Sequence, residues 1–231
     1  MVIKVRNKTK DFNSYRAKRV KSLFNAENGS EFNLDADLDI DGEEWQIGLV
    51  VGPSGSGKTS IGKALFEGAG ITDLYSGWSG GKPIVDDIAP DGDFNAVTGA
   101  LASVGLGDVP SWLRPFHALS NGQQFRAGLA RAVVNAEDET IIDEFTSVID
   151  RQIAKIGAMA FQKAWRRTKG KRVVLLACHY DIVEWLQPDW VYDTGTATLK
   201  KERSLSQDQS LSSKLGRSTQ VTGSILKSII I

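Results

Sequence analysis

The residues between Gly52 and Ser60 have types and a spacing that could bind a polyphosphate. The stretch fits the pattern G-x-x-x-x-G-K-[ST] at Gly52, Gly57, Lys58 and Thr59. Glycine allows positive φ angles and lets the backbone come close to a ligand, so successive N–H groups can surround phosphate oxygens. Lys58 would add charge for the outer phosphates, and the Thr59 hydroxyl would coordinate Mg²⁺. We therefore expect a phosphate-binding loop made of Gly52, Pro53, Ser54, Gly55, Ser56, Gly57, Lys58, Thr59 and Ser60.

Two adjacent acids further along the chain could complete this chemistry. Asp143 and Glu144 follow the apolar segment Thr140–Ile142, which we expect to be a buried strand. A carboxylate in this position holds the Mg²⁺ shell in enzymes with such a loop, and a second carboxylate can polarise an attacking water. A solvated turn is the alternative interpretation of the two acids taken alone.

The elements that position these residues follow from the hydrophobic pattern. Trp45–Val51 is predicted to be a buried strand that leads into the loop, and Thr59–Glu67 a helix whose N-terminus faces the phosphates. Further helices are expected over 93–104, 120–134, 152–167 and 181–186, and further strands over 140–142, 173–178, 190–193 and 196–199. Strands that alternate with helices predict an α/β fold with a mainly parallel sheet flanked by helices. Short β-like stretches in residues 1–50, with turns at Asn28-Gly29 and Asp41-Gly42, predict a small N-terminal antiparallel layer.

Length and composition limit the domain organisation and the class of protein. A chain of 231 residues suits one α/β domain, which we place at 1–199 with a helical insert at about 70–118. Residues 200–231 are rich in Ser, Gln and Lys and contain no aromatic residue, so we expect a disordered polar tail. The single cysteine, Cys178, and the lack of a signal-peptide-like or membrane-length apolar run predict a cytoplasmic protein without a membrane-inserted segment.

The charges balance overall but are segregated near the N-terminus. Residues 1–21 carry eight basic side chains and one acid, whereas residues 22–57 carry eight acids and no Lys or Arg. Such asymmetry has two interpretations, which are a contact with DNA and a pair of oppositely charged neighbouring strands. We favour the neighbouring strands.

Three further motifs carry a resemblance to a known family. Leu119-Ser-Asn-Gly-Gln-Gln124 resembles the Leu-Ser-Gly-Gly-Gln signature of ABC-type ATPases. Asp143-Glu-Phe-Thr-Ser-Val-Ile-Asp150 resembles the Walker B segment and D-loop of that family, and His179 stands where the family has its switch histidine. With the phosphate-binding loop as Walker A, four motifs occur in the family's order, and we identify the chain as an ABC-type ATPase domain with a reduced helical subdomain.

The resemblance implies a function for each motif. The family forms a head-to-tail homodimer on ATP binding, with two Mg-ATP molecules in the interface, so the chain is expected to be an ATP hydrolase. Glu144, His179 and Lys58 would be catalytic, and Asp150 would help to link the two sites. The signature residues Ser120, Asn121, Gly122 and Gln123 begin a helix, and backbone N–H groups at a helix N-terminus bind anions, here the γ-phosphate held by the other copy. ATP rather than GTP rests on the resemblance alone.

The chain departs from the family pattern at several positions. Asn121 replaces a glycine, which a turn-like position would tolerate because Asn accepts positive φ. Phe145 replaces the usual proline. No glutamine lies between Lys58 and Gln123, so the family's Q-loop residue is missing, and we take Asp86 or Asp87 as its substitute, with Asp87 as the expected metal ligand. Phe24 is the preferred adenine-stacking aromatic, ahead of Phe32 and Tyr15.

The stretch between the phosphate-binding loop and the signature indicates which branch of the family the chain resembles. Only 60 residues separate Lys58 from Leu119, which is short for a transporter subunit. The segment Gly105–Pro115 resembles soluble ABC-type ATPases that are often fused to an acetyltransferase-like domain, which implies such a domain or another protein as partner. We therefore expect a soluble ATPase that acts on a partner. The alternatives are an ATP-gated module that binds DNA or protein and hydrolyses ATP slowly, and the ATP-binding subunit of a transporter.

Overall fold

Strand β3 (Ile47–Val51) lies inside a six-stranded sheet because its five residues are apolar or glycine and all five are buried. Its neighbours on the two sides are β6 (Arg172–Ala177) and β7 (Trp190–Asp193), and both run parallel to it. The full strand order is β4-β5-β6-β3-β7-β8, with β4 at Ile71–Thr72, β5 at Glu139–Ile142 and β8 at Thr198–Lys201. Only β8 is antiparallel to its neighbour, so the sheet is mainly parallel, as the sequence predicts.

The computed structural model of the 231-residue chain describes residues 2–8, 12–25, 31–40, 42 and 44–201. Within this part, the helices are α1 (Tyr15–Phe24), α2 (Lys58–Leu65), α3 (Ile84–Asp87), α4 (Phe94–Ser103), α5 (Val109–Trp112), α6 (Asn121–Val134), α7 (Arg151–Trp165) and α8 (Ile182–Leu186), with a 3₁₀ turn η1 at Phe116–Ala118. None of these helices combines the length and the apolar character that a membrane span requires.

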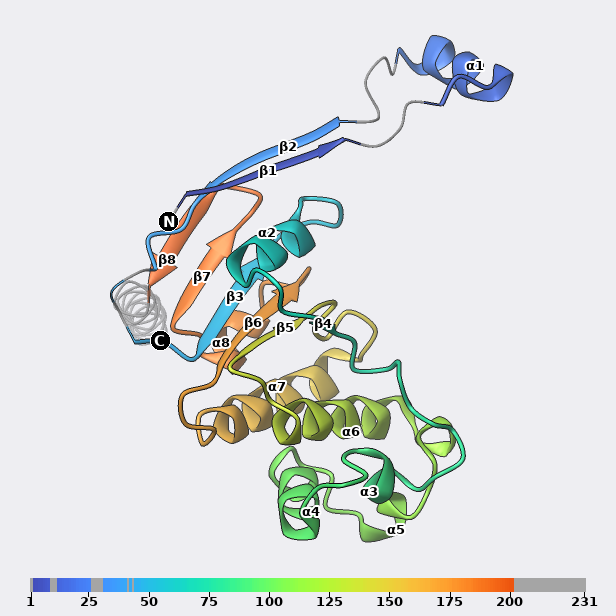
Figure 1. Ribbon diagram of the computed structural model, residues 1–231, viewed down its shortest axis with the longest axis vertical. Coiled ribbons are helices and arrows are strands. Elements are labelled where there is room, and N and C mark those ends of the chain that lie inside the picture. The colour runs from blue at the N-terminus through green and yellow to red at the C-terminus, as the bar shows by residue number, and fades with distance from the viewer. Residues whose placement is uncertain (1, 9–11, 26–30, 41, 43, 202–231) are drawn as a thin grey trace, which may run out of the picture.

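The sheet is buried on both faces, as expected for parallel strands covered by helices. Alternate residues of β3 and β6 point to opposite sides, so Val50 and Leu176 pack with Ile61 of α2. Leu49 and Leu175 pack on the other face in the cluster that contains the buried side chains of α6 and α7. Figure 1 shows the same layers, with α2 above the sheet and α6 and α7 below it.

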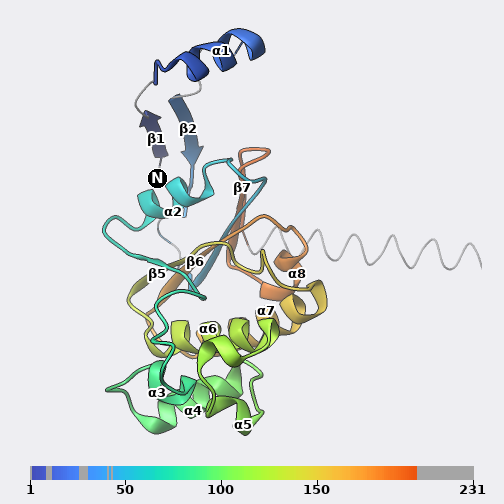
Figure 2. The ribbon, with the colours of Figure 1, turned by 90° about the vertical axis from the view of Figure 1, so that its right-hand side faces the viewer.

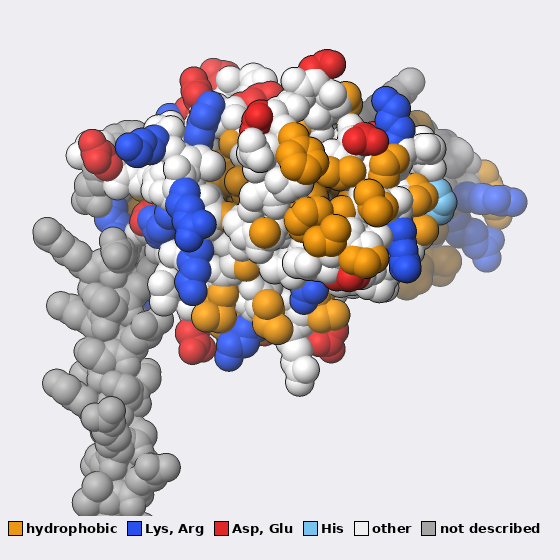
Figure 3. All heavy atoms as spheres, turned by 90° about the horizontal axis from the view of Figure 1, so that it is seen from below, with side chains coloured by type: hydrophobic (Ala, Val, Ile, Leu, Met, Phe, Trp, Pro, Cys, Tyr) orange, Lys and Arg blue, Asp and Glu red, His pale blue; other side chains and the backbone are white. Residues whose placement is uncertain are grey.

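A further helical layer lies beneath α6 and α7. It consists of α3, α4 and α5, which follow β4 in the chain and precede α6 (Figures 1 and 2). Asp93 caps α4 by accepting the Ala96 N–H at 2.8 Å. Seen from below, hydrophobic side chains gather over this part of the surface (Figure 3), and Phe94 and Leu113 are both 69% exposed there.

The N-terminal strands form a separate two-stranded sheet. β1 (Val2–Lys8) pairs antiparallel with β2 (Glu31–Asp37), which confirms the predicted antiparallel layer. Arg6 forms an ion pair with Asp35 at 2.6 Å, so part of the segregated charge serves to pair these strands. Tyr15–Phe24, for which the sequence pattern predicted no element, is the helix α1.

Several other boundaries differ slightly from the prediction. Lys200 and Lys201 belong to β8, so the last strand continues beyond the predicted boundary at 199, and 202–231 lies outside the described residues. Val109–Trp112, for which no element was predicted, is a single helical turn that accommodates Pro110 in its first positions. The proposed turn at Asn28-Gly29 also falls outside the described residues.

Candidate functional site

The carboxyl ends of four neighbouring parallel strands bring the predicted site residues to one edge of the sheet. Gly52 follows β3, Asp143 follows β5, and His179 comes two residues after β6. β4 lies beside β5 with Thr72 opposite Ile142, so Asp73 joins the same edge. Ligands of open α/β sheets bind outside the carboxyl ends of their strands, so this edge is the candidate site.

The phosphate-binding loop is held in a fixed shape by its own backbone and by the turn after β7. Gly57 is the N-cap of α2 with a φ of 90°, and no side chain caps the helix there. The first N–H groups of α2 therefore lack a side-chain acceptor and suit an anion. The Ser56 hydroxyl lies 2.6 Å from that of Thr194, and a Cβ on Gly52 would lie 2.0 Å from the same Thr194 oxygen. Glycine is therefore required at position 52.

Lys58 is a buried cation inside this loop. It is 7% exposed, and its ammonium donates to the carbonyl oxygens of Gly52 at 3.0 Å and of Pro53 at 2.8 Å. Carbonyl dipoles compensate a buried charge only in part, so the position favours an anionic ligand. This is the role that the sequence predicts for Lys58.

A hydrogen bond joins the loop to the acid pair. The Thr59 hydroxyl donates to Asp143 Oδ2 at 2.8 Å, although the two residues are 84 positions apart. A hydroxyl and a carboxylate oxygen at this separation are ligands that Mg²⁺ accepts, so the donor set fits the ion. No group of three or more His, Cys, Asp and Glu residues gathers within the described ranges, so phosphate and water oxygens would have to complete its shell.

The backbone after Asp143 adopts an unusual conformation. Glu144 has a φ of 53° and Thr146 a φ of 64°. Residues other than glycine rarely adopt positive φ angles. The Glu144 N–H donates to Asp143 Oδ1 at 2.8 Å, and the Ser147 N–H donates to the Glu144 carbonyl at 3.1 Å. Such strain persists where the surroundings enforce it, and it concentrates at functional sites.

Phe145 contributes to these surroundings in a way that the usual proline could not. Its N–H donates to the Leu176 carbonyl of β6 at 2.9 Å, a bond that a proline lacks the hydrogen to make. Its fully buried ring lies 5.9 Å from the ring of Phe125 on α6 and 5.8 Å from that of Phe161 on α7. The substitution therefore ties the acid pair to β6 and to two helices, which the sequence pattern did not reveal.

His179 and the residues after it form the neighbouring part of the edge. His179 Nδ1 is buried and has no hydrogen-bond partner within the described part of the chain. The Tyr180 hydroxyl donates to Asp193 Oδ1 at 2.9 Å, and the Gly195 N–H donates to the same oxygen at 2.8 Å. Burial raises the pKa of Asp193, but these hydrogen bonds together with those from Thr196 outweigh it and hold the pKa below its ordinary value.

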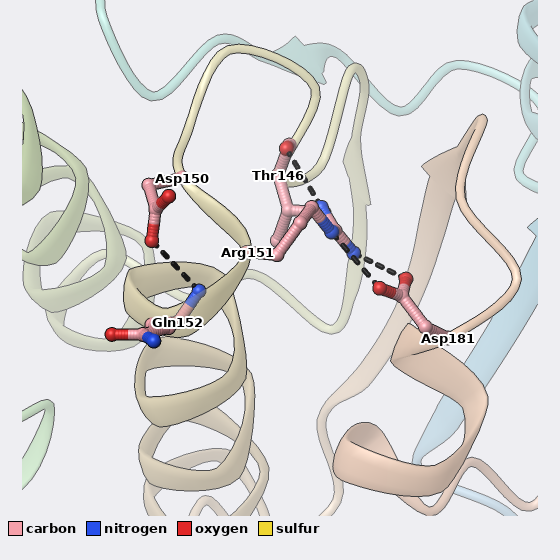
Figure 4. A network of polar contacts seen from close by, with 5 residues as sticks. All are labelled: Thr146, Asp150, Arg151, Gln152 and Asp181. Atoms are coloured by element: carbon pink, nitrogen blue, oxygen red, sulfur yellow. Dashed lines mark hydrogen bonds and ion pairs between the residues drawn. The ribbon is translucent and has the colours of Figure 1, made fainter.

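Arg151 links the segment after the acid pair to the segment after His179 (Figure 4). Its guanidinium donates to both carboxylate oxygens of Asp181, from Nε to Oδ2 at 2.9 Å and from Nη2 to Oδ1. Nη1 lies 3.4 Å from both the carbonyl and the hydroxyl oxygen of Thr146. The adjacent Asp150 caps α7 by accepting the Gln152 N–H at 2.9 Å. Sequence reasoning assigned a role to Asp150 but missed Arg151 and Asp181.

The signature residues form the capped start of α6. The Ser120 hydroxyl accepts the Gln123 N–H, and the Gln123 side chain accepts the Ser120 N–H at 3.0 Å. Ser120 and Asn121 are exposed, and Gly122 is buried. Asn121 is the first residue of the helix and is absent from the positive-φ residues, so its tolerance of positive φ is not what admits it here.

Two predicted site residues lie away from the edge of the sheet. Asp87 is on α3, where it accepts the Ser79 N–H at 2.8 Å, and this hydrogen bond does not involve the loop at 52–60. The residue that the sheet order brings beside Asp143 is Asp73 instead. Phe24 is 75% exposed at the end of α1, and among the described residues no ring stacking or hydrogen bond joins it to the loop.

Comparison with known proteins identifies relatives of one kind. The chain is 31% identical over 161 residues to the zinc import ATP-binding protein ZnuC of Jannaschia sp., covering 61% of this chain and 65% of that protein. It is also 31% identical over 151 residues to the cytochrome c biogenesis ATP-binding export protein CcmA of Paracoccus denitrificans, covering 58% of this chain and 70% of that protein. The chain thus spans a little less than two thirds of the first relative. No protein-family model matches it.

Solved structures share the fold at lower sequence identity. A dimeric bacterial ABC transporter cassette has a TM-score of 0.57 at 16% identity, with 87% of this chain and 99% of that chain covered. A post-hydrolysis state of the same cassette, bound to ADP and Pi, has a TM-score of 0.58 with the same identity and coverage. Together with the 31% identity to a relative of which 70% is covered, the shared fold leads to one conclusion. The chain belongs to the family of ABC-type ATPases.

Proposed function

We propose that this chain binds Mg-ATP and hydrolyses it between two head-to-tail copies of itself, and that the cycle changes the conformation of a partner. The observation that carries the proposal is the hydrogen bond from Thr59 to Asp143, because it joins the phosphate-binding loop and the acid pair in one site. The relatives are named as ATP-binding proteins, and a structure of the same fold is described as bound to ADP and Pi, which supports ATP as the substrate.

Each residue of the site has a role in this reaction. The loop N–H groups and Lys58 bind the phosphates and stabilise the charge that develops on them. Thr59 and Asp143 would hold Mg²⁺, which supplies charge neutralisation at the phosphate oxygens. Glu144 orients a water for attack on the γ-phosphorus and accepts its proton as the bond to ADP breaks. Asp73, at the same edge as Asp143, takes the position that the missing glutamine leaves.

The second copy completes the site through its signature helix. The N-terminus of α6 is exposed at Ser120 and Asn121, and the hydrogen bonds described for Ser120 and Gln123 stay within that end of the helix. A helix N-terminus attracts phosphate through its free N–H groups and its dipole. The dimeric cassette of the same fold supports an arrangement in which this end, with Gly122 and Gln123, meets the γ-phosphate bound by the other copy. Asp150 and His179 would then lie close to the interface.

The test is the oligomeric state of Glu144→Gln with and without Mg-ATP, measured by light scattering after size exclusion. The amide keeps the shape of the side chain but cannot accept the proton, so ATP turnover should be lost while ATP remains bound. We expect a monomer that becomes a dimer only with Mg-ATP. A matched control, Glu184→Gln on α8, should retain wild-type turnover. Normal turnover of Glu144→Gln would refute the assignment of Glu144, and a monomer in both conditions would refute the shared site.

A second candidate function is the ATP-binding subunit of a transporter. The relatives favour it, since one is named as an import protein and the other as an export protein. The 60 residues between Lys58 and Leu119 led us to prefer action outside a transporter. Purification of the chain from detergent-solubilised membranes of its native host distinguishes the two, because a transporter subunit should bring a membrane-spanning protein with it in stoichiometric amount.

A further inference from the structure

Helix α1 is a basic helix that buries none of its own residues. Every other helix of the described chain has at least one buried residue, whereas α1 has none. Large apolar side chains stand exposed on it and just before it, namely Phe12 at 67%, Tyr15 at 75%, Val20 at 53%, Leu23 at 67% and Phe24 at 75%. Exposed apolar side chains gathered in one short segment mark an interaction surface.

The helix is held by its own ends rather than by packing. The Ser14 hydroxyl accepts the Ala17 N–H at 3.2 Å, and Arg19 donates to the Tyr15 hydroxyl at 3.0 Å. Asn25 closes the helix in the left-handed conformation and donates its N–H to the Lys21 carbonyl. Helices shorter than about 12 residues are marginal in water without a packed face. A ten-residue helix with good caps and no packed face is therefore suited to gain its packing from another body.

The apolar side chains of α1 lie mostly on one side of its axis, with basic side chains at both margins. At 100° per residue, Ala17, Val20 and Phe24 share one side, with Leu23 at its margin. Lys18 lies on the opposite side and Lys21 at the margin beside Ala17. Arg16 lies at the other margin, between Val20 and Leu23, and Arg19 lies beyond Leu23. The helix contains four basic residues and no acid. It is amphipathic, and its charge is of one sign.

We infer that α1 docks on the anionic surface of a lipid membrane. A helix in the plane of the membrane interface places its apolar arc at the acyl boundary, while flanking Lys and Arg side chains extend to the headgroups. Duplex DNA would attract the same cations but offers no apolar layer for Val20, Leu23 and Phe24. The α1 of a second copy carries the same four positive charges and would repel this one.

The position of α1 permits such docking without hindrance to the nucleotide site. In Figures 1 and 2 it lies beyond the outer end of the β1–β2 hairpin, on the side away from α3, α4 and α5. The hydrogen bonds of Ser14, Arg19 and Asn25 described above involve neither the loop at 52–60 nor Asp143. The inference therefore does not depend on the proposed ATPase cycle.

Co-sedimentation of the full chain with vesicles tests the inference at low salt. Vesicles of phosphatidylcholine and phosphatidylglycerol in equal parts should bind about tenfold more protein than vesicles of phosphatidylcholine alone. Added salt should abolish this difference because it screens the charges. The apolar variant Val20→Ser/Leu23→Ser and the charge variant Arg16→Gln/Lys18→Gln should each reduce binding by about tenfold. The control Val109→Ser/Leu113→Ser removes an apolar pair of matching exposure, 52% and 69%, and should leave binding unchanged.

Each other outcome overturns the inference. No binding to anionic vesicles, equal binding to neutral vesicles, or an equal loss in the control variant would show that α1 does not dock on an anionic membrane. Binding to a short DNA duplex that falls only in the charge variant, without vesicle binding, would assign α1 to nucleic acid instead. Turnover of ATP by both α1 variants should equal that of the wild type, so a failed ATPase assay and a failed vesicle assay remain separate results.

Discussion

Arg151 and Asp181 form a two-point hydrogen-bonded ion pair between two loops that meet only in the folded chain. Arg151 follows Asp150, the last residue of the acid-pair segment, and Asp181 comes two residues after His179. The same guanidinium also reaches Thr146, whose strained backbone lies two residues from Glu144. The pair therefore positions relative to each other the two segments that we propose to be catalytic.

Removing this pair should affect turnover more than stability. The two side chains are 35% and 44% exposed, so Arg151→Ala should cost about 1 kcal/mol of unfolding free energy or less. Because small displacements of reacting groups are costly, kcat should fall about tenfold with little change in KM. Arg151→Lys should recover only part of this loss, since an ammonium lacks the two-point geometry. The ion pair Lys171–Asp138 lies elsewhere, and Lys171→Ala should leave kcat unchanged. Equal kcat in both alanine variants would contradict the positioning role.

The Thr59 hydroxyl should be required for activity with Mg²⁺. Thr59→Val keeps the volume but removes the oxygen that donates to Asp143, so turnover should fall about 100-fold and the Mg²⁺ concentration for half-maximal rate should rise. Thr59→Ser keeps the oxygen and should retain most of the rate. Steady-state kinetics over a Mg²⁺ titration measures both effects. If the valine and serine variants behaved alike, the hydroxyl would have no part in the metal site.

Asp73 and Asp87 are two candidates to replace the missing Q-loop glutamine, and alanine substitution at each position distinguishes them. Each carboxylate accepts one backbone N–H at 2.8 Å, from Tyr75 and Ser79 respectively, so alanine removes the same local contact at both positions. Only Asp73 directly follows β4, the strand that pairs with β5, and Asp143 directly follows β5. We therefore expect Asp73→Ala to lower kcat about tenfold and Asp87→Ala to change it less than about twofold. The reverse pattern, in the same assay, would restore Asp87 as the substitute.

Gly128 should be irreplaceable for a steric reason that also bears on the site. A Cβ at this position of α6 would lie 2.6 Å from the carbonyl oxygen of Leu74, the residue after Asp73. Gly128→Ala should therefore destabilise the fold by about 2 kcal/mol, as overpacking does. Gly99→Ala in α4 meets nothing within 4 Å and should stabilise by up to about 1 kcal/mol. Urea unfolding of both variants gives the comparison, and similar midpoints would contradict the clash.

The elements that could be predicted are those determined by residues that are close together in the sequence. A strand of buried residues, a glycine-rich loop and a helix follow one another at 47–65, so the local pattern sufficed to place the candidate phosphate-binding loop and α2. Ser120 likewise predicts the start of α6, because the capping box is contained in four consecutive residues. The predicted Walker motifs and signature are likewise short segments that can be recognised in the sequence alone.

The parts that were missed depend on residues far apart in the sequence. β4 is two residues long, too short for a periodic pattern, and only its pairing with β5 shows that Asp73 lies at the edge of the sheet. The bond between Phe145 and Leu176 and the pair of Arg151 with Asp181 depend on the order of strands, which local sequence does not encode. Helix α1 was missed because it has no buried face, and a buried face is what hydrophobic periodicity detects.

The strand order also has a consequence for the synthesis of this protein. β3 carries the loop that defines the family, yet its two neighbours in the sheet are β6 and β7, which are translated long after it. At ribosomal speeds, the roughly 120 residues between Val51 and Val173 take about ten seconds to emerge. During that interval the five apolar or glycine residues of β3 have neither edge paired. The nascent chain therefore presents its most hydrophobic strand to chaperones well before the sheet that buries it can form.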